Sequence, residues 1–337
     1  MLTAKKLRRK PKHFHNFTGL TPHQFDELLL AIEPLYEKAE EERLENPNRL
    51  RARGAGRNFN LGLSERLLMS LMYFRLYVTQ TLLGYLFDLD SSNVNREINE
   101  RMVAVLSEVL PVPARDEPLL DLLAAQVASS SSSSSGSSSG DGGKRKRKKK
   151  IGTLEELLDS HPEFEEILID ATEQELPKPK DRGRRKEFYS GKRKRHTAKI
   201  QVVSTKNKKL VLHLCRHVPG RVSDLVLIRA TGVMRRIPKE GVVVRVDKGY
   251  EGLEEEYPEV EVQKPKKARR GHPLTVLEKI YNRAMSTLRM PVEHVIGHLK
   301  KYRLLAGIYR GRPERYDESA LVIAGLNNYR ELGKLSW

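Results

Sequence analysis

A serine- and glycine-rich stretch divides this chain of 337 residues into two parts. Residues Ser129 to Gly143 (SSSSSSSGSSSGDGG) contain almost no side chain that could be buried, and the following run KRKRKKK, Lys144 to Lys150, repels itself. Such a composition is typical of a flexible linker. We therefore expect a first domain at residues 1–127, a disordered linker at 128–150 and a second domain at 151–337, each domain being long enough to bury its own core.

The charge of the chain indicates a polyanionic partner. Lys and Arg number 62 against 44 Asp and Glu, which gives a formal net charge of +18. Beyond the N-terminal tail, the excess is concentrated in three segments: Lys144 to Lys150, Arg182 to Lys199 and Lys264 to Arg270. Such clusters favour nucleic-acid binding, although ribosomal proteins and membrane-surface proteins are also basic. The run at Lys144 is interpreted as a solvated tether or, in a eukaryotic host, as a nuclear localisation signal.

The sequence predicts an intracellular protein without membrane contact. No stretch approaches the roughly 20 uninterrupted apolar residues of a membrane span, and no apolar core follows the basic N-terminus MLTAKKLRRKPKHF. Cys215 is the single cysteine, which excludes an intramolecular disulfide and a cysteine-based zinc site. We expect a cytoplasmic, nucleoid-associated protein if the host is a bacterium and a nuclear protein if it is a eukaryote.

The part before the linker has the hydrophobic spacing of helices. Thr21 is a suitable N-cap, and apolar side chains recur at three- and four-residue spacing after it, at Phe25, Leu28, Leu29, Ile32 and Leu35. Ser64 begins another such segment, with apolar residues at Leu67, Leu68, Leu71, Met72 and Leu76. The spacing therefore predicts an all-helical first domain.

Within this domain, residues 79–110 predict a helix-turn-helix. Thr79 to Phe87 has the pattern of a short helix, Asp88 to Ser91 that of a turn, and Ser92 to Leu110 that of a longer helix. The inward side of the longer helix is expected to hold Val94, Ile98, Met102 and Val105. Any helical hairpin has the same periodicity, so the basic composition is needed to favour DNA. In that interpretation base edges or phosphates are contacted by Ser92, Asn93, Asn95 and Arg96.

After the linker, strands alternate with helices. The expected strands are Glu166 to Ala171, His196 to Ser204, Lys209 to Val218, Gly241 to Val246 and Val260 to Val262. A helix is expected at Ser223 to Thr231. A long final helix is expected to bury one face, formed by Leu277, Ile280, Ala284, Leu288, Val292, Val295, Ile296 and Leu299. This order predicts an α+β or α/β fold with a mixed sheet covered by helices.

Three acidic residues stand at positions that suit a metal site. Asp170 ends the first expected strand and Asp247 ends the fourth, while Glu293 lies on the last helix. Side chains at the ends of neighbouring strands can converge, and oxygen-only ligands suit Mg²⁺ or Mn²⁺. The alternatives are a strand-terminal cap for each Asp and a solvated position for Glu293. His294 and His298 flank Glu293 at helical spacing, which suits zinc or simply one solvated face.

Four segments resemble motifs of the DDE-type bacterial insertion-sequence transposases, which combine an N-terminal helix-turn-helix with a ribonuclease-H-like catalytic domain. LIDATE at residues 168–173 is similar to the first-strand motif of that family, and DKGYEG at residues 247–252 to its second-Asp motif. YSGKRKRHT at residues 189–197 resembles the basic entry into the second strand. The family's spaced arginine, glutamate and lysine on the catalytic helix correspond to Arg289, Glu293 and Lys300.

The resemblance implies a ribonuclease-H-like second domain that cleaves DNA at transposon ends and transfers the released 3′-hydroxyl into target DNA. It implies two ions of Mg²⁺ or Mn²⁺ bound by Asp170, Asp247 and Glu293. Strand or phosphate contacts are implied for Lys192, Arg193, Lys194, Arg195, Arg289 and Lys300. The implied partners are double-stranded DNA, as terminal inverted repeats and as target, and at least one further copy of the chain in a homodimer or larger complex. Asp224 resembles a recurring acid of the family, although a helix N-cap explains it equally well.

Three alternatives to a transposase remain open at the level of sequence. A domesticated relative would bind DNA without cutting it, and the presence of all three acids argues against this. A ribonuclease-H-type enzyme acting on RNA would not need the helix-turn-helix. A basic scaffold with incidental acids would show no dependence on metal.

Overall fold

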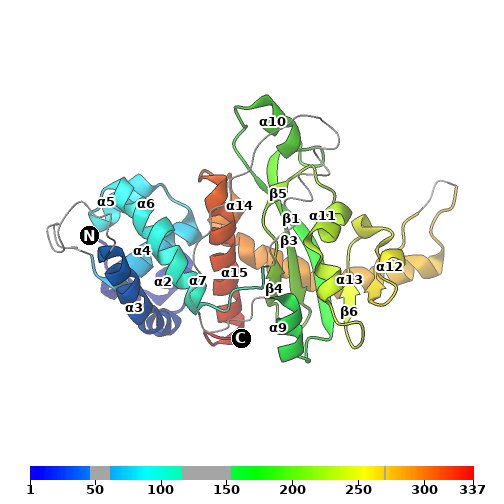
Figure 1. Cartoon of the computed structure of the whole chain (residues 1–337), viewed down its shortest axis with the longest axis horizontal. Helices are drawn as coiled ribbons and strands as arrows, with labels where there is room; N and C mark the ends of the chain where they lie inside the picture. Colours follow the sequence, from blue (N-terminus) through cyan, green and yellow to red (C-terminus); the bar gives the residue numbers. More distant parts are fainter. Residues whose placement is uncertain (46–60, 116–152, 269–270) are drawn as a thin grey trace. The chain divides into compact units, whose positions relative to one another are not determined.

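The computed structural model describes residues 1–45, 61–115, 153–268 and 271–337 (Figure 1). These residues form two compact units. The helical unit consists of Met1–Pro113, Gln174–Pro179 and Val295–Trp337, and the sheet unit of Ala114–Glu173 and Lys180–His294. The predicted linker and both predicted domain boundaries lie outside the described residues, so the division at residues 127 and 150 stays a prediction.

The helical unit begins with helices whose N-termini the sequence makes recognisable. Its N-terminal part contains α1 (Ala4–Arg8), α2 (Pro11–Thr18), α3 (Pro22–Leu44), α4 (Leu63–Leu76) and α5 (Gln80–Phe87). Thr21 caps α3 in a reciprocal capping box with Gln24, as the sequence predicts. Thr79 caps α5 by accepting a hydrogen bond from the N–H of Leu82. Helix α4 begins at Leu63, one residue before the predicted start at Ser64, and Gly62 is its N-cap.

The second helix of the helix-turn-helix is continuous but contains a π-helical turn. It consists of α6 (Ser91–Arg96), a π-helix at Glu97–Met102 and α7 (Val103–Val109). The predicted inward residues are confirmed, because Val94, Ile98, Met102 and Val105 are all buried. The turn begins at Glu97, a buried carboxylate that accepts hydrogen bonds from Tyr36, Arg66 and Arg101. This network ties the helix to α3 and α4.

The end of the chain completes the helical unit. After the last turn of α13 (Val276–Lys300) the unit contains α14 (Arg303–Ala306), a 3₁₀ turn at Pro313–Arg315 and α15 (Tyr316–Leu332). Helix α15 packs on α7, and its Asn328 Nδ2 donates to the carbonyl of Pro111 over 3.0 Å. Its Tyr329 hydroxyl bonds the Gln24 carbonyl and the Glu27 carboxylate of α3. The prediction that α13 is the final helix is therefore wrong.

The sheet unit is built on a mixed seven-stranded sheet of described residues. The strands are β1 (Glu166–Glu175), whose last two residues belong to the helical unit, β2 (Tyr189–Ser190), β3 (Arg195–Thr205), β4 (Val211–Leu214), β5 (Val218–Pro219), β6 (Val243–Arg245) and β7 (Glu261–Gln263). The order is β2-β3-β1-β6-β7, with β4 and β5 also paired to β3. Strands β1, β6 and β7 pair in parallel, whereas β3 is antiparallel to β2, β4 and β5. The predicted fold class, helices followed by a mixed sheet covered by helices, is confirmed.

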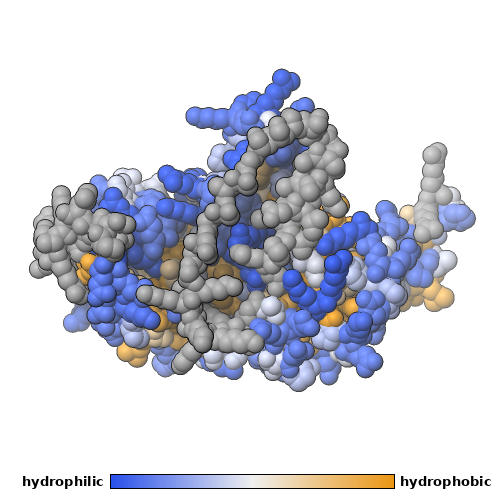
Figure 2. All heavy atoms as spheres, in the orientation of Figure 1, coloured by the Kyte–Doolittle hydropathy of each residue, from blue (hydrophilic) through white to orange (hydrophobic). Residues whose placement is uncertain are grey.

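Helices accompany the sheet, and one of them extends past it. α9 (Leu154–Ser160) contacts β4, and α11 (Asp224–Thr231) contacts β3. The basic α10 (Arg182–Phe188) contacts β3 and projects beyond the strands in Figure 1. Hydrophilic side chains cover α10 on the face shown in Figure 2. The sequence does not predict this helix, because it has no apolar face and none of its residues is buried.

Two sequence predictions for this unit are wrong. Leu277 and Ile280 of α13 are 78% and 60% exposed. The expected burial fails because the apolar spacing of α13 continues beyond the part of the helix that packs, which within the sheet unit starts at Met285. Asp224 is not an N-cap, because Ser223 caps α11 by accepting from the N–H of Val226.

None of the helices in the described ranges has both the length and the apolar character of a membrane span.

Candidate active site

Two neighbouring parallel strands bring Asp170 and Asp247 close together. In the register of β1 and β6, Leu168 pairs with Arg245. Asp170 lies two residues further along β1 and Asp247 two residues past the last residue of β6, so the two occupy equivalent positions in this register. The prediction that Asp170 ends its strand is wrong, because β1 continues to Glu175. Side chains two residues apart on a strand point to the same face, and adjacent strands lie about 4.8 Å apart. The parallel pairing therefore explains the proximity of the two carboxylates.

The electrostatics of Asp170 are those of a crowded acidic site. Burial raises the pKa of Asp170 above its ordinary value, and the nearby carboxylates of Asp247 and Asp224 raise this pKa further. The backbone N–H of Ala171 and the charge of Arg289 oppose the increase. A pair or trio of carboxylates in partly buried surroundings favours any cation that can neutralise it.

The positive charge that compensates the carboxylates of Asp170 and Asp247 in this structure is that of Arg289. Its Nη1 donates to Oδ1 of Asp247 over 2.8 Å, and its side chain is 10% exposed against 48% for Asp247. The resemblance implies that this arginine holds phosphate. The contact with Asp247 adds a second role, because a nearly buried guanidinium compensates two carboxylates in the absence of other cations.

A second group of charged residues, contributed by β1, β3 and α11, is not predicted by the sequence. Lys199 of β3 is buried, and its Nζ lies 2.9 Å from Oδ1 of Asp224 and 3.9 Å from Oε1 of Glu173. Glu173 also accepts a hydrogen bond from Thr197 Oγ1 over 2.7 Å. Lys199 thus holds Asp224, at the first turn of α11, beside Asp170. The only signal in the sequence is a lysine inside the apolar run of the second strand.

Tyr250 marks the buried side of this cluster. Burial raises the pKa of its hydroxyl well above the ordinary value, and the charges of Asp224 and Asp170 raise it further. The tyrosine lies in the 3₁₀ turn Lys248–Tyr250 that follows Asp247. The motif DKGYEG therefore combines the carboxylate of Asp247 with a buried tyrosine whose hydroxyl interacts electrostatically with Asp224 and Asp170.

Glu293 is placed differently from the two aspartates. It lies on α13 four residues after Arg289, and so on the same side of the helix, but its side chain is exposed. For the described residues the structure shows no hydrogen bond or ion pair of Glu293, and no three His, Cys, Asp or Glu side chains lie close enough together to hold a metal ion as they stand. The structure thus places Asp170 and Asp247 at matching positions on paired strands, whereas Glu293 lies on the helix α13.

The donor set at the sheet edge suits a divalent metal ion. Asp170 and Asp247 supply oxygen ligands on rigid strands, and the raised pKa of Asp170 reflects negative charge that a bound cation would relieve. Asp224 adds a third carboxylate to the same electrostatic environment. These features fit Mg²⁺ or Mn²⁺ better than zinc, because the cluster contains no histidine or cysteine.

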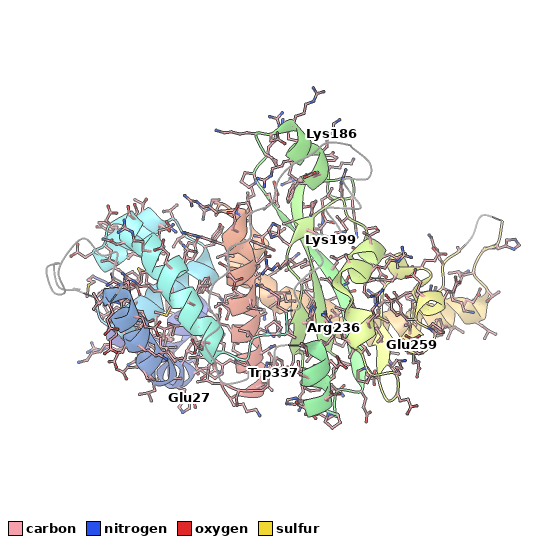
Figure 3. All side chains as sticks on the ribbon, viewed as in Figure 1. Glu27, Lys186, Lys199, Arg236, Glu259 and Trp337 are labelled. Carbon is pink, nitrogen blue, oxygen red and sulfur yellow. The ribbon has the colours of Figure 1, made fainter. Side chains whose placement is uncertain are left out.

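Four of the basic residues predicted to contact DNA are exposed. Lys192, Arg193 and Lys194 lie in the turn between β2 and β3, in which Lys194 adopts a left-handed backbone with φ of 54°, and Arg195 is the first residue of β3. Figure 3 shows Lys186 at the outer end of the same unit and Lys199 within the sheet. Lys300 ends α13 and belongs to the helical unit, whereas the carboxylates belong to the sheet unit.

The residues at the start of α6 have well-defined local contacts. Ser92, Asn93 and Arg96 are exposed, and Arg96 Nη1 donates to Asn93 Oδ1 over 3.2 Å. The carboxylate of Asp90 accepts from the N–H of Ser92 over 2.7 Å and caps the helix. Asn95 is half-buried and bonds both Gln80 and Arg315.

Comparison with known proteins agrees with both units. Residues 169–328 match the family described as DDE superfamily endonuclease, and residues 59–110 match the helix-turn-helix of DDE superfamily endonuclease. The chain is also 27% identical over 331 residues to the probable transposase for insertion sequence element IS702 from Microchaete diplosiphon, with 97% of this chain and 95% of that protein covered. The chain belongs to the DDE-type insertion-sequence transposases.

This membership accounts for the arrangement described above. The endonuclease match begins at Ile169, one residue before Asp170, and includes Asp247 and Glu293. The helix-turn-helix match covers α4 to α7, so the transposase has a DNA-binding element in its helical unit. No solved structure gives a significant match to the transposase.

Proposed function

We propose that this transposase cuts DNA at the ends of its own element and joins the released 3′-hydroxyl to target DNA, in a reaction that requires Mg²⁺ or Mn²⁺. The observation that supports this most directly is the equivalent position of Asp170 and Asp247 in the register of the parallel strands β1 and β6. Divalent ions held by these carboxylates would supply activation of the attacking oxygen and stabilisation of the leaving one.

Each residue of the site has a part in this proposal. Asp170 and Asp247 hold the cations on a rigid sheet edge, and Glu293 completes the ligand set from α13. Lys199 positions Asp224 so that its negative charge remains near Asp170. A cation bound to Asp247 would replace Arg289 there, and the guanidinium would then be available to a phosphate group of the DNA.

DNA is proposed to contact both units. Ser92, Asn93, Asn95 and Arg96 contact the terminal inverted repeat, and the exposed Lys192, Arg193, Lys194 and Arg195 hold the strand that enters the site. Lys300 contributes a further phosphate contact. Because two element ends are joined in one event, the active complex contains at least two copies of the chain. Its expected location is the nucleoid of a bacterial cell or, in a eukaryotic host, the nucleus.

Cleavage of supercoiled DNA carrying the element's own ends tests the proposal. Wild type is compared with Asp170→Ala, Asp247→Ala and Glu293→Ala, with and without Mg²⁺ or Mn²⁺. The matched control is Glu259→Ala, which removes an exposed carboxylate of the same unit (Figure 3). We expect metal-dependent nicking in wild type and control, and loss of nicking with retained DNA binding in the three variants.

Other outcomes would overturn specific parts of the proposal. Binding of duplex DNA without cleavage in either metal would show that the chain acts as a DNA-binding protein only. Preferential cleavage of an RNA–DNA hybrid would show that the substrate of the enzyme is RNA and not duplex DNA. Normal cleavage by Glu293→Ala would remove Glu293 from the ligand set while leaving the two aspartates in it.

A further inference from the structure

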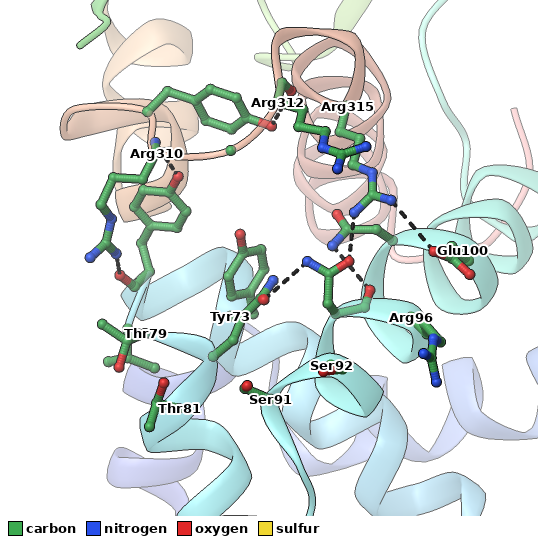
Figure 4. Close-up of a pocket in the computed structure, with 17 residues that line it drawn as sticks. Tyr73, Thr79, Thr81, Ser91, Ser92, Arg96, Glu100, Arg310, Arg312 and Arg315 are labelled. Atoms are coloured by element: carbon green, nitrogen blue, oxygen red, sulfur yellow. Dashed lines mark hydrogen bonds and ion pairs between the residues drawn. The ribbon is translucent and has the colours of Figure 1, made fainter.

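A pocket in the helical unit joins the helix-turn-helix to a segment from the other end of the sequence. It has a volume of about 780 Å³, enough for several atoms of a nucleic-acid backbone rather than a single ion. Residues of α5 and α6 form one side, and the segment Tyr309–Arg315 forms the other (Figure 4). This segment follows the catalytic helix in the chain and lies outside the helix-turn-helix match at residues 59–110.

The lining of the pocket is strongly basic. Four arginines line the pocket, and the only carboxylate among its described lining residues is that of Glu100. The arginines are Arg96 from α6 and Arg310, Arg312 and Arg315 from the C-terminal segment. Most of the remaining lining residues are neutral polar side chains or tyrosines. Such a composition favours an extended phosphate backbone, which offers several negative charges in a row.

Aromatic residues hold the C-terminal segment firmly against the helix-turn-helix. The rings of Tyr309 and Tyr77 are stacked with centroids 6.3 Å apart. The N–H of Arg310 donates to the Tyr77 hydroxyl over 2.7 Å, and its guanidinium lies 4.5 Å from the centroid of the same ring. Tyr309 is buried, and its hydroxyl donates to the carbonyl of Arg312. The segment is therefore ordered before any DNA binds, which reduces the entropic cost of binding.

A hydrogen-bonded chain links the same segment to Asn95, one of the four residues of α6 that are predicted to contact base edges or phosphates. Arg315 Nη1 donates to Asn95 Oδ1 over 2.6 Å, and Asn95 Nδ2 donates to Gln80 Oε1 over 3.0 Å (Figure 4). An asparagine amide has two donor hydrogens and two acceptor lone pairs. Arg315 and Gln80 use one of each, so Asn95 keeps one donor and one acceptor in a fixed orientation. Arg315 is therefore a positioning residue.

Arg312 differs from its neighbours. It is exposed, and the structure shows no hydrogen bond or ion pair of its guanidinium with any described residue. Its carbonyl, held by Tyr309, anchors the backbone while the charged end of the side chain remains available. This combination suits a contact with one phosphate group.

We propose that Tyr309–Arg315 is part of the DNA-binding surface of the transposase, with Arg312 binding a backbone phosphate of the duplex that α6 contacts and Arg315 orienting Asn95 toward the bases. This rests on the proposed function only in that α6 contacts duplex DNA. The segment, which the family match includes in the endonuclease region, thus contributes to recognition as well.

Binding of the full chain to a labelled duplex of the element's end, measured by fluorescence anisotropy in EDTA over a range of salt concentrations, tests Arg312. We expect Arg312→Ala to reduce the slope of log K against log[salt] by about 0.9, which corresponds to roughly eightfold weaker binding at about 0.1 M salt. The matched control is Arg303→Ala, an exposed arginine of α14 that does not line the pocket. Its slope is expected to equal that of wild type.

Sequence preference tests Arg315. A phosphate contact is blind to sequence, so Arg312→Ala should weaken binding to the element's end and to a scrambled duplex equally. Arg315→Met should instead reduce the ratio between the two affinities, and Asn95→Ala should reduce it by the same factor without adding to the effect of Arg315→Met. Unfolding temperatures of the variants identify any loss of folding.

The outcomes separate the two proposals. If wild type binds and Arg96→Ala weakens binding while Arg312→Ala matches wild type, the inference about the C-terminal segment is wrong and the helix-turn-helix proposal stands. If Arg303→Ala reduces the salt slope as much as Arg312→Ala, the change in slope follows from the loss of any positive charge. The inference about Arg312 is then also wrong. If wild type does not bind duplex DNA at all, both proposals fall.

Discussion

Arg289 and Asp247, which are 42 residues apart in the chain, form a hydrogen-bonded ion pair at the edge of the sheet. The arginine is nearly buried and the aspartate is half-exposed, so the positive charge reaches the carboxylate from the protein side. Asp247 therefore keeps an open side toward solvent. We therefore expect Arg289 to compete with any divalent cation for Asp247.

Replacing Arg289 should lower the unfolding temperature in EDTA and increase the stabilisation by Mn²⁺. We expect Arg289→Met to unfold a few degrees lower in EDTA, because it loses an interaction worth about 1 kcal/mol at a half-exposed carboxylate. We expect a larger increase of the unfolding temperature with Mn²⁺, because the competing charge is gone. Differential scanning fluorimetry measures both, with Arg283→Met on the same helix as the control. A smaller increase with Mn²⁺ than in wild type would contradict the competition.

The raised pKa of Asp170 predicts how stability depends on pH without metal. An acid with a higher pKa in the folded protein holds its proton more tightly there, so the free energy of unfolding falls as pH rises from the ordinary value of 3.8 through the raised pKa. Asp170→Asn cannot ionise. In EDTA we expect this variant to be more stable than wild type at about pH 7, with a smaller difference at about pH 4. Urea unfolding at the two pH values measures this, and a difference independent of pH would refute it.

The buried carboxylate at the π-helical turn should be essential for the helical unit. Glu97 is 2% exposed and lies against Arg66, which is 6% exposed. Removing one partner of a buried pair leaves the other charge uncompensated, so we expect Glu97→Ala to lower the free energy of unfolding by about 3–5 kcal/mol. Glu108→Ala, an exposed position on α7, should change it by less than about 0.5 kcal/mol. Similar effects for the two variants in urea unfolding would show that the network contributes little.

Helix α15 should be required for DNA binding although it is remote in sequence from the helix-turn-helix. Leu326 is fully buried, and Leu326→Ala should cost about 2–5 kcal/mol through the cavity that it leaves. We expect DNA binding to be lost at a lower temperature than in wild type, as followed by anisotropy during heating. Lys334→Ala, an exposed change just after the helix, serves as the control. Loss of binding at the same temperature in both variants would contradict the requirement.

Features set by local sequence were predicted well. Asp170 and Asp247 could be assigned to neighbouring core strands because each follows a short apolar run, although β1 continues past Asp170 to Glu175 and only Asp247 lies at the end of its run. The cap at Thr21 and the inward face of the second helix of the helix-turn-helix are equally local. The family membership, predicted from four motifs, is confirmed by the comparisons.

Features that depend on packing between distant segments could not be predicted. The exposure of Leu277 depends on where α13 stops contacting the rest of its unit, and apolar spacing carries no such information. The bond between Arg315 and Asn95 joins residues 220 positions apart. Lys199 shows the same limit, because a lysine in a strand pattern normally indicates a solvated face, whereas here Asp224 and Glu173 compensate it.

The interrupted course of the helical unit has a consequence for the timing of its synthesis. Helices α1 to α7 leave the ribosome first, but α15 and the arginines at 312 and 315 follow only after residues 114–311 have been translated. At about 5–20 residues per second, that interval lasts roughly 10–40 s. A nascent chain, or one ended early by a stop codon, therefore has its helix-turn-helix without the closing helix and without half of the basic pocket. If Tyr309–Arg315 contributes to DNA binding as we propose, a chain that stops before Arg312 would bind an element end more weakly than a chain that includes this segment and α15.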